Sequence, residues 1–265
     1  MTNDTANTDK ATQETVLDVR RWTDNLLSFT TTRPPGYRFI AGQFARLGLL
    51  ADECMVWRAY SMTSAPKEDH LEFYSIVVPG GLFTTVLRDL QPGAKIWVEK
   101  QCFGFMTMDR FTGGEDFWMF ATGTGIGPYI SILRDAEAWT RFRRMIVVHG
   151  VRHASEFAYH DELRALAQRP PVDAPSPATL QVIGAVSRDK DAASAKGYLE
   201  GRITTLLEDG SLEKAAGIAM TPEASRIMMC GNPAMIEDMR RILHAREMRP
   251  VRRAIPGQFL TENYW

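Results

Sequence analysis

A glycine-rich segment offers the clearest chemistry in this 265-residue chain. Residues 121–128 read ATGTGIGP and lie between an apolar, strand-like run and a segment with helical spacing. Glycines in such a turn let the backbone approach a pyrophosphate, and the N–H groups that begin the next helix attract negative charge. Pro128 suits the first helical turn, where its missing N–H is not needed. Because the spacing is GxGxG rather than GxGxxG, a turn selected only for tight packing is the alternative.

Arginines follow the strand-like runs of the same half of the chain. The run RMIVVHG ends in Val151-Arg152, and not in the acidic residue that would hold the ribose hydroxyls of NAD. Ser187-Arg188 follows the run LQVIGAV, and Arg202 precedes a predicted helix. Guanidinium groups match the oxygens of a 2′-phosphate, and each charged hydrogen bond contributes on the order of 1.5–3 kcal/mol. We therefore expect a preference for NADPH over NADH, with solvated surface arginines as the alternative.

Two further segments carry side chains of chemical interest. Arg58, Tyr60 and Ser61 lie in a strand-like run, where an arginine can pair with a pyrophosphate, a tyrosine can stack on a flat heterocycle and a hydroxyl can bond the flavin N5. An ordinary edge strand is the alternative for this run. Cys230 ends a buried run and precedes Gly-Asn-Pro, at the strand end where α/β proteins bind ligands. A buried structural cysteine is the alternative there.

The order of apolar runs predicts two domains. Residues 12–100 contain six short β-prone runs and one predicted helix at residues 82–90, which indicates an antiparallel barrel or sandwich. After about residue 115, strands alternate with helical segments, which indicates a parallel sheet of βαβ units. The predicted fold class is therefore an N-terminal antiparallel β-barrel, of a size that suits a flavin, followed by a parallel-sheet α/β domain that binds a nucleotide. We place a flexible N-terminus at residues 1–14, the barrel at 15–107 and the α/β domain at 108–265, with surface loops at 169–179 and 188–197.

Composition excludes several classes of protein. The net charge of −1 and the lack of a basic tail argue against nucleic-acid binding. The three cysteines, Cys54, Cys102 and Cys230, show no CxxC or Cys/His spacing, which argues against a metal site or a disulfide framework. The first fifteen residues are polar, unlike a signal peptide, and no apolar run approaches the ~18 residues of a membrane span. We expect a cytoplasmic protein without membrane contact.

Five segments together resemble one family. They are RAYSMTSAP, LEFYSIVVPGG, ATGTGIGPYISILRD, MMCGNPAMIEDM and the ending ENYW. In this order they are similar to bacterial ferredoxin–NADP⁺ reductases, the flavodoxin/ferredoxin reductases, from about residue 15 to the end of the chain. The resemblance implies non-covalent FAD on the barrel, NADP(H) on the α/β domain, and electron exchange between NADPH and ferredoxin or flavodoxin.

The resemblance also implies a set of site residues. Those expected at FAD are Arg58, Tyr60, Ser61, Phe73, Tyr74, Ser75, Ile76, Val77, Gly81, Leu82, Phe83 and Thr84. Those expected at NADP(H) are Thr122, Gly123, Thr124, Gly125, Arg152, Ser187, Arg188, Arg202, Cys230, Gly231 and Met235. The catalytic candidates are Ser61, Cys230 and Glu262: Cys230 aligns the nicotinamide, Ser61 supports the proton at the flavin N5, and Glu262 serves in proton relay or in positioning the ring. Near the chain end, Tyr264 is expected to stack on the isoalloxazine and Trp265 to pack nearby.

The sequence also suggests how the protein meets its partner and which other functions are open to it. A monomer that meets an acidic carrier is expected, and the arginine-rich residues 240–253 are one candidate docking face, with a solvated surface as the alternative. A reductase that serves an oxygenase or free flavin is a close alternative function. A non-catalytic nucleotide-binding or redox-sensing module, with Cys54 and Cys102 as responsive thiols, is a more distant one.

Overall fold

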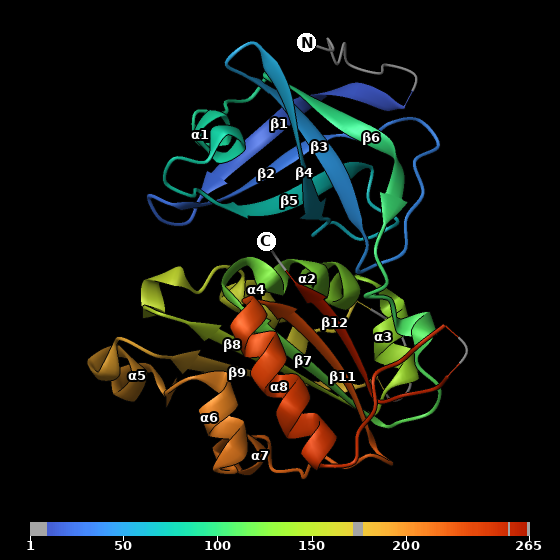
Figure 1. Cartoon of the computed structure of the whole chain (residues 1–265), viewed down its shortest axis with the longest axis vertical. Coiled ribbons are helices and arrows are strands. Elements are labelled where there is room, and N and C mark those ends of the chain that lie inside the picture. The colour runs from blue at the N-terminus through green and yellow to red at the C-terminus, as the bar shows by residue number, and fades with distance from the viewer. Residues whose placement is uncertain (1–9, 172–176, 254, 264–265) are drawn as a thin grey trace.

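The computed structural model describes residues 10–171, 177–253 and 255–263, which form two domains stacked along the long axis of the molecule (Figure 1). The N-terminal domain is a six-stranded antiparallel sheet in the order β4-β3-β6-β1-β2-β5. Its strands are β1 (Ala11–Arg21), β2 (Leu26–Thr32), β3 (Phe44–Ala51), β4 (Cys54–Ser61), β5 (His70–Ile76) and β6 (Lys95–Phe103). A bridge between Met62 and Phe73 joins the two outer strands, so the sheet curls into the expected barrel.

Alternation of apolar residues gives the barrel its core. Phe29, Leu47 and Phe73 are buried inside, and helix α1 (Leu82–Arg88) adds Phe83 and Leu87 to the same core. The helix lies where the sequence predicts it but ends two residues earlier. Strand β1 begins at Ala11, so the assignment of residues 11–14 to a flexible segment was wrong. Those residues pair with β6, since Ala11 and Glu14 are buried along that edge.

The C-terminal domain is a six-stranded parallel sheet in the order β10-β9-β8-β7-β11-β12. Its strands are β7 (Asp116–Thr122), β8 (Arg144–Val151), β9 (Thr179–Val186), β10 (Leu199–Glu200), β11 (Ser225–Gly231) and β12 (Phe259–Asn263). Its helices are α2 (Gly127–Arg134), α3 (Ala136–Arg141), α4 (His160–Gln168), α5 (Lys190–Lys196), α6 (Ile203–Glu208), α7 (Ser211–Ala216) and α8 (Pro233–Ala245). Short 3₁₀ turns are η1 (Met108–Arg110), η2 (Gly123–Ile126) and η3 (Ala154–Glu156). Apolar cores lie on both faces of this sheet, as its continuous apolar runs predict.

The α/β domain differs from the predicted elements in several details. Residues 190–196, expected to be part of a loop, form helix α5. The predicted helix after the glycine turn breaks at Asp135, whose extended backbone separates α2 from α3. Strand β12 was not predicted, because only its alignment beside β11 reveals it as a strand.

A polar cluster and an aromatic cluster join the two domains. Arg134 of α2 binds Glu72 of the barrel and also donates to both carboxylate oxygens of Glu162, at 2.6 and 2.9 Å. The Tyr159 hydroxyl donates to Glu72 over 3.1 Å, and its ring lies 4.7 Å from that of Trp22. These contacts fix the barrel against one edge of the α/β domain.

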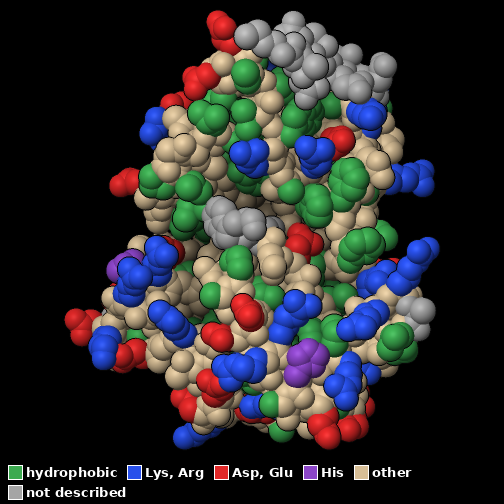
Figure 2. Space-filling view, in the orientation of Figure 1, with side chains coloured by type: hydrophobic (Ala, Val, Ile, Leu, Met, Phe, Trp, Pro, Cys, Tyr) green, Lys and Arg blue, Asp and Glu red, His purple; other side chains and the backbone are tan. Residues whose placement is uncertain are grey.

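The face of the molecule shown in Figure 2 has no strong segregation of charge. Figure 2 shows basic and acidic side chains intermixed over the α/β half of the molecule, with apolar side chains more frequent on the barrel half. Within the described ranges, no helix is both long enough and apolar enough to cross a membrane.

Candidate active site

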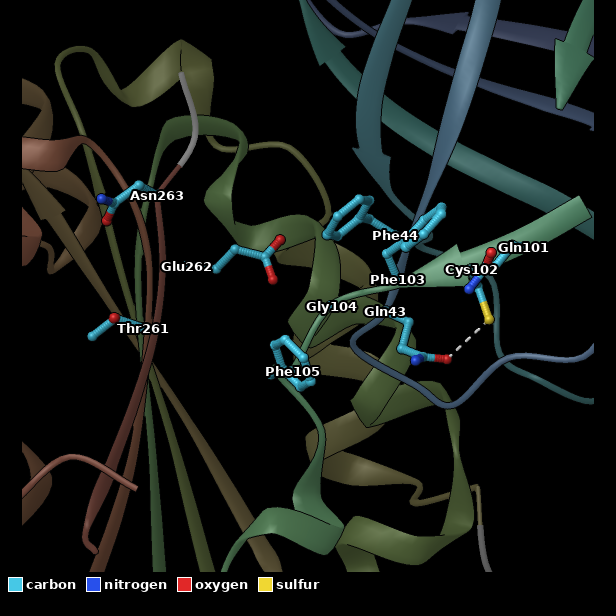
Figure 3. Close-up of a pocket in the computed structure, with 10 residues that line it drawn as sticks. All are labelled: Gln43, Phe44, Gln101, Cys102, Phe103, Gly104, Phe105, Thr261, Glu262 and Asn263. Carbon is cyan, nitrogen blue, oxygen red and sulfur yellow. Dashed lines mark hydrogen bonds between the residues drawn. The ribbon is translucent and has the colours of Figure 1, made fainter. Parts of the chain in front are cut away.

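A pocket of about 660 Å³ lies between the two domains. Its walls come from the start of β3, the end of β6, the connection that follows β6 and the end of β12 (Figure 3). The lining residues are Gln43, Phe44, Gln101, Cys102, Phe103, Gly104, Phe105, Thr261, Glu262 and Asn263. Pockets at domain junctions are common cofactor sites.

Glu262 is the acidic residue among those that line this pocket. Figure 3 shows its carboxylate directed away from β12 toward the barrel, where the rings of Phe44 and Phe103 lie, whereas Thr261 and Asn263 point away. Burial raises the pKa of Glu262 to about 7. A carboxyl group with that pKa exchanges a proton near neutral pH, which suits a proton donor or acceptor.

The glycine turn, Cys230 and Glu262 converge at the carboxyl edge of the parallel sheet. Cys230 lies beside Glu262 in the β11–β12 register, and it is completely buried. A Cβ atom on Gly125 would approach the Cys230 carbonyl oxygen to 2.3 Å, so only glycine fits there. Close packing therefore explains the glycine at position 125. This agrees with the alternative interpretation of the motif, a turn selected for tight packing.

Gly123 has a different environment from Gly125. Its φ of +54° favours glycine, and a Cβ atom built there would meet nothing within 4 Å. The backbone of the turn is thus open to a ligand at Gly123. Thr122 is occupied elsewhere, because its hydroxyl accepts the Asn232 N–H at 2.8 Å and leaves no room for a side chain on Gly231.

The three candidate arginines lie at this same edge. Arg152, Arg188 and Arg202 are exposed, and among the described residues no ion pair involves their guanidinium groups. Their backbone is well held, since Arg188 N–H donates to the Arg152 carbonyl at 2.9 Å and Arg152 N–H donates to Glu156 at 2.8 Å. Exposed, uncompensated guanidinium groups on a fixed backbone provide a site for a phosphate. Ser187 follows β9 beside them.

On the barrel, the structure brings Tyr60 and Ser75 together. The Tyr60 hydroxyl and Ser75 Oγ are 3.0 Å apart, and Phe83 supports the tyrosine ring from 5.4 Å. Ser61 is buried and pairs with Phe44 of the pocket in the β3–β4 register. Arg58 is exposed nearby.

Other predicted FAD contacts have side chains engaged elsewhere. Phe73 and Val77 lie in the barrel core, and Tyr74 packs edge-on against Tyr159 at the domain contact. The Thr84 hydroxyl closes the turn before α1 by hydrogen bonding Val78, so it is not open to a ligand. Ile76 is half-buried and Leu82 is exposed.

Met235 and the two aromatic residues that end the chain were also predicted to contact a cofactor. Met235 is buried in the core beneath α8 rather than open at the edge of the sheet. Tyr264 and Trp265 lie outside the described residues, so their expected stacking stays a prediction.

The sequence patterns missed most of the pocket wall. Gln43, Phe44 and residues 101–105 belong to no recognisable motif, and only the folded domain junction brings them to Glu262. The change of pattern between the two halves of the chain was the available signal, because cofactor sites favour such junctions.

Comparisons with known proteins agree with this geometry. Two family models match: the oxidoreductase FAD-binding domain at residues 22–102 and the oxidoreductase NAD-binding domain at residues 119–241. The chain is 39% identical over 251 residues to the flavodoxin/ferredoxin–NADP reductase of Shigella flexneri, covering 94% of this chain and 97% of the relative. It is 36% identical to the ferredoxin–NADP reductase of Pseudomonas aeruginosa, covering 94% and 95%.

A solved structure is similar over nearly the whole chain. The ferredoxin NADP⁺ reductase of Neisseria gonorrhoeae, with bound FAD and NADP, superposes with a TM-score of 0.88 at 35% identity and covers 96% of this chain and 98% of that one. A flavohemoglobin of Malassezia yamatoensis, at 15% identity and a TM-score of 0.75, shares the fold.

Proposed function

The chain belongs to the family of ferredoxin/flavodoxin–NADP reductases, and from this premise we propose how its own residues divide the work. The protein is an FAD-dependent oxidoreductase that exchanges electrons between NADPH and a one-electron carrier, ferredoxin or flavodoxin. Bound FAD supplies the chemistry that links a two-electron hydride donor to a one-electron acceptor. The observation that carries the assignment of residues is the convergence of the glycine turn, Cys230 and Glu262 at the edge of the sheet that faces the barrel.

The residues present fit both cofactors. On the barrel, the half-buried Tyr60 ring, supported by Phe83, offers a flat surface for the isoalloxazine. On the α/β domain, the open backbone at Gly123 accepts a pyrophosphate, and the arginines after β8 and β9 bind the 2′-phosphate. Arg58 binds the FAD pyrophosphate.

Cys230 and Glu262 have separate tasks at the reacting centre. Cys230 is fixed by the packing of its backbone on Gly125, and it positions the nicotinamide without acting as a nucleophile. Glu262, whose burial raises its pKa to about 7, would accept, together with Ser61, the proton that a bound flavin loses from N5 when it passes its electrons to the carrier.

The arginine-rich segment at residues 240–253 does not lie beside this pocket. Helix α8 starts at the carboxyl edge of the sheet and ends at the opposite edge (Figure 1). There the Gln258 N–H, just before β12, donates to the backbone carbonyl of Arg249. Arg241 and Arg246 are also paired with Glu208 and Glu213. We therefore place the carrier at the pocket instead, where Phe105 is 72% exposed and Arg110 lies 5.3 Å from its ring.

Carrier reduction tests this placement. Phe105→Ser and Arg110→Glu are expected to lower kcat/KM for ferredoxin or flavodoxin about tenfold, because an apolar anchor and a steering charge are lost. NADPH-dependent reduction of ferricyanide should be unchanged in the same variants.

The matched control reverses two distant charges. Arg249→Glu/Arg252→Glu should leave carrier reduction and its salt dependence as in the wild type. If this double variant impairs the carrier reaction and the pocket variants do not, docking occurs on the α8 side. If free flavin is reduced faster than either carrier, the protein serves the alternative role of a flavin reductase. That the protein is a cytoplasmic monomer stays a prediction from the sequence.

A further inference from the structure

A pair of buried histidines lies directly beneath the glycine turn. His149 is in β8, beside Ala121 of β7 in the sheet register, and His160 begins α4. His149 Nδ1 is 3.1 Å from His160 Nε2, and His149 Nε2 is 2.9 Å from the Gly123 carbonyl oxygen. The two side chains are 0% and 4% exposed. Neither histidine belongs to the site assigned above.

The hydrogen bonds define the tautomers of both rings. The Gly123 carbonyl can only accept, so His149 Nε2 must carry a hydrogen and donate. In a neutral ring Nδ1 is then an acceptor, so His160 Nε2 donates to it. The result is a directed chain from His160 to His149 to Gly123. His160 Nδ1, at the far end, has no hydrogen-bond partner among the described residues.

Burial keeps both rings neutral at pH 7. Desolvation lowers the pKa of His149 to about 4, against hydrogen bonding to Gly123 and the nearby charge of Glu156, which raise it. Desolvation, His149 and Arg164 together lower the pKa of His160 to about 2. The chain of hydrogen bonds therefore does not change its protonation in the neutral range.

Aromatic rings prevent the histidines from turning. Phe157 stacks on His160 with centroids 4.0 Å apart and meets His149 edge-on at 5.4 Å. Tyr198 lies 4.5 Å beyond Phe157. Gly184 makes room for this group, since a Cβ atom there would lie 2.9 Å from Phe157 and 2.6 Å from Tyr198.

The direction of the Gly123 carbonyl decides what the turn presents to a ligand. The peptide unit is planar and trans, so its C=O and the following N–H point in opposite directions. Because His149 holds the Gly123 oxygen on its own side of the turn, planarity directs the N–H of Thr124 to the opposite side. The turn also has free space at Gly123, where a built Cβ atom would meet nothing within 4 Å.

We propose that His149, oriented by His160, is a positioning residue that keeps the glycine turn in the conformation that binds the pyrophosphate of NADP(H). The proposal rests on the assignment of that turn to the pyrophosphate. It goes beyond that assignment by naming what fixes the peptide plane.

The test compares two ligands in matched variants. His149→Leu keeps an apolar side chain of similar size but removes the donor, and His149→Gln keeps an amide N–H near the Nε2 position. His149→Leu should weaken NADP⁺ binding about tenfold, equivalent to about 1.4 kcal/mol, and leave 2′-AMP binding unchanged, since 2′-AMP carries the 2′-phosphate but lacks the pyrophosphate. The KM for NADPH should rise with little change in kcat, and His149→Gln should restore most of the affinity.

Other outcomes overturn the proposal. Unchanged NADP⁺ affinity in His149→Leu, an equal loss for NADP⁺ and 2′-AMP, or no rescue by glutamine would each contradict it. If His149→Leu does not retain FAD, His160→Leu decides the matter, with an expected loss of about threefold for NADP⁺ only. No loss there would contradict the proposal as well.

A separate variant distinguishes failure of this proposal from failure of the site assignment. Gly123→Val forces a β-branched residue into positive φ and distorts the turn directly. If it weakens NADP⁺ while His149→Leu does not, only the histidine proposal fails. If neither variant affects NADP⁺, the turn itself is not the pyrophosphate site.

Discussion

At the scale of single residues, Glu262 links the structure to pH. Its carboxyl group is buried in the pocket, and that burial raises its pKa to about 7. Below this pH the group holds a proton, and above it the proton is lost. Hydride from NADPH gives N5 its hydrogen without a separate proton, and that hydrogen leaves as a proton when the flavin passes its electrons to the carrier. A carboxylate that accepts this proton would act above about pH 7 and fail as the pH falls.

Replacing Glu262 by glutamine tests this role. When enzyme already reduced by NADPH is rapidly mixed with oxidised carrier, the wild-type rate of flavin reoxidation is expected to rise as the pH rises through about 7. Glu262→Gln should be at least about tenfold slower in this reoxidation, within the range of general acid–base catalysis, and should show no such inflection. A variant that keeps the wild-type pH profile would remove Glu262 from the proton path.

The sequence predicts which residues are candidates for the site better than it predicts what surrounds each of them. Arg152, Arg188 and Cys230 were predicted from their places after strand-like runs, and Glu262 from the family resemblance of the chain end; their roles stay predictions. The histidine pair was not found, since His149 and His160 meet only when β8 packs against α4. The side chains of Phe73 and Val77 point into the barrel core rather than toward a ligand, a direction that a four-residue motif does not determine.

At the scale of secondary-structure elements, the two ends of each parallel strand have different roles. Strand β8 has an arginine beyond each end: Arg143 before it, paired with Glu115 at 3.5 Å, and Arg152 after it. Only the carboxyl end faces the glycine turn. The same side chain at opposite ends of one strand therefore gives a matched comparison.

Substitution at the two ends of β8 should have different effects on cofactor choice. Arg152→Gln combined with Arg188→Gln is expected to raise the KM for NADPH by about ten- to a hundredfold, from the loss of charged hydrogen bonds to the 2′-phosphate. The KM for NADH should not change, and Arg143→Gln should alter neither value. Equal losses for NADPH and NADH would mean that these arginines do not read the 2′-phosphate.

Elements with a strong internal pattern were predicted well, and the edge strands of the parallel sheet were not. The six barrel strands, helix α1 and the four central strands of the parallel sheet follow from alternation and from continuous apolar runs. Strand β12 is five residues long and polar at its end, so it depends on β11 for its definition. It nevertheless carries Glu262 into the pocket.

At the scale of the whole molecule, the reaction depends on how the two domains are held. Arg134 binds the barrel through Glu72 and its own domain through Glu162. Since the pocket spans both domains, a change in their relative position would alter the distance between the two cofactors.

The two glutamates allow this coupling to be isolated. Glu72→Gln is expected to lower the free energy of unfolding by about 1–3 kcal/mol and to separate the unfolding of the two domains in urea, followed by tryptophan fluorescence and flavin absorbance. Glu162→Gln weakens the ion pair that Arg134 makes within its own domain. In this variant the transitions seen by tryptophan fluorescence and by flavin absorbance should stay coincident. Separation in both variants, or in neither, would contradict a specific role for Glu72 in joining the domains.

The central claim is that the barrel and the carboxyl edge of the parallel sheet bring a flavin and a nicotinamide together in one cleft. Anaerobic titration of the purified protein, followed by visible absorbance, tests it most directly. We predict a yellow protein that NADPH bleaches at about one equivalent per flavin, with NADH reacting far more slowly. A colourless protein, or a flavin spectrum that NADPH leaves unchanged, would contradict the account.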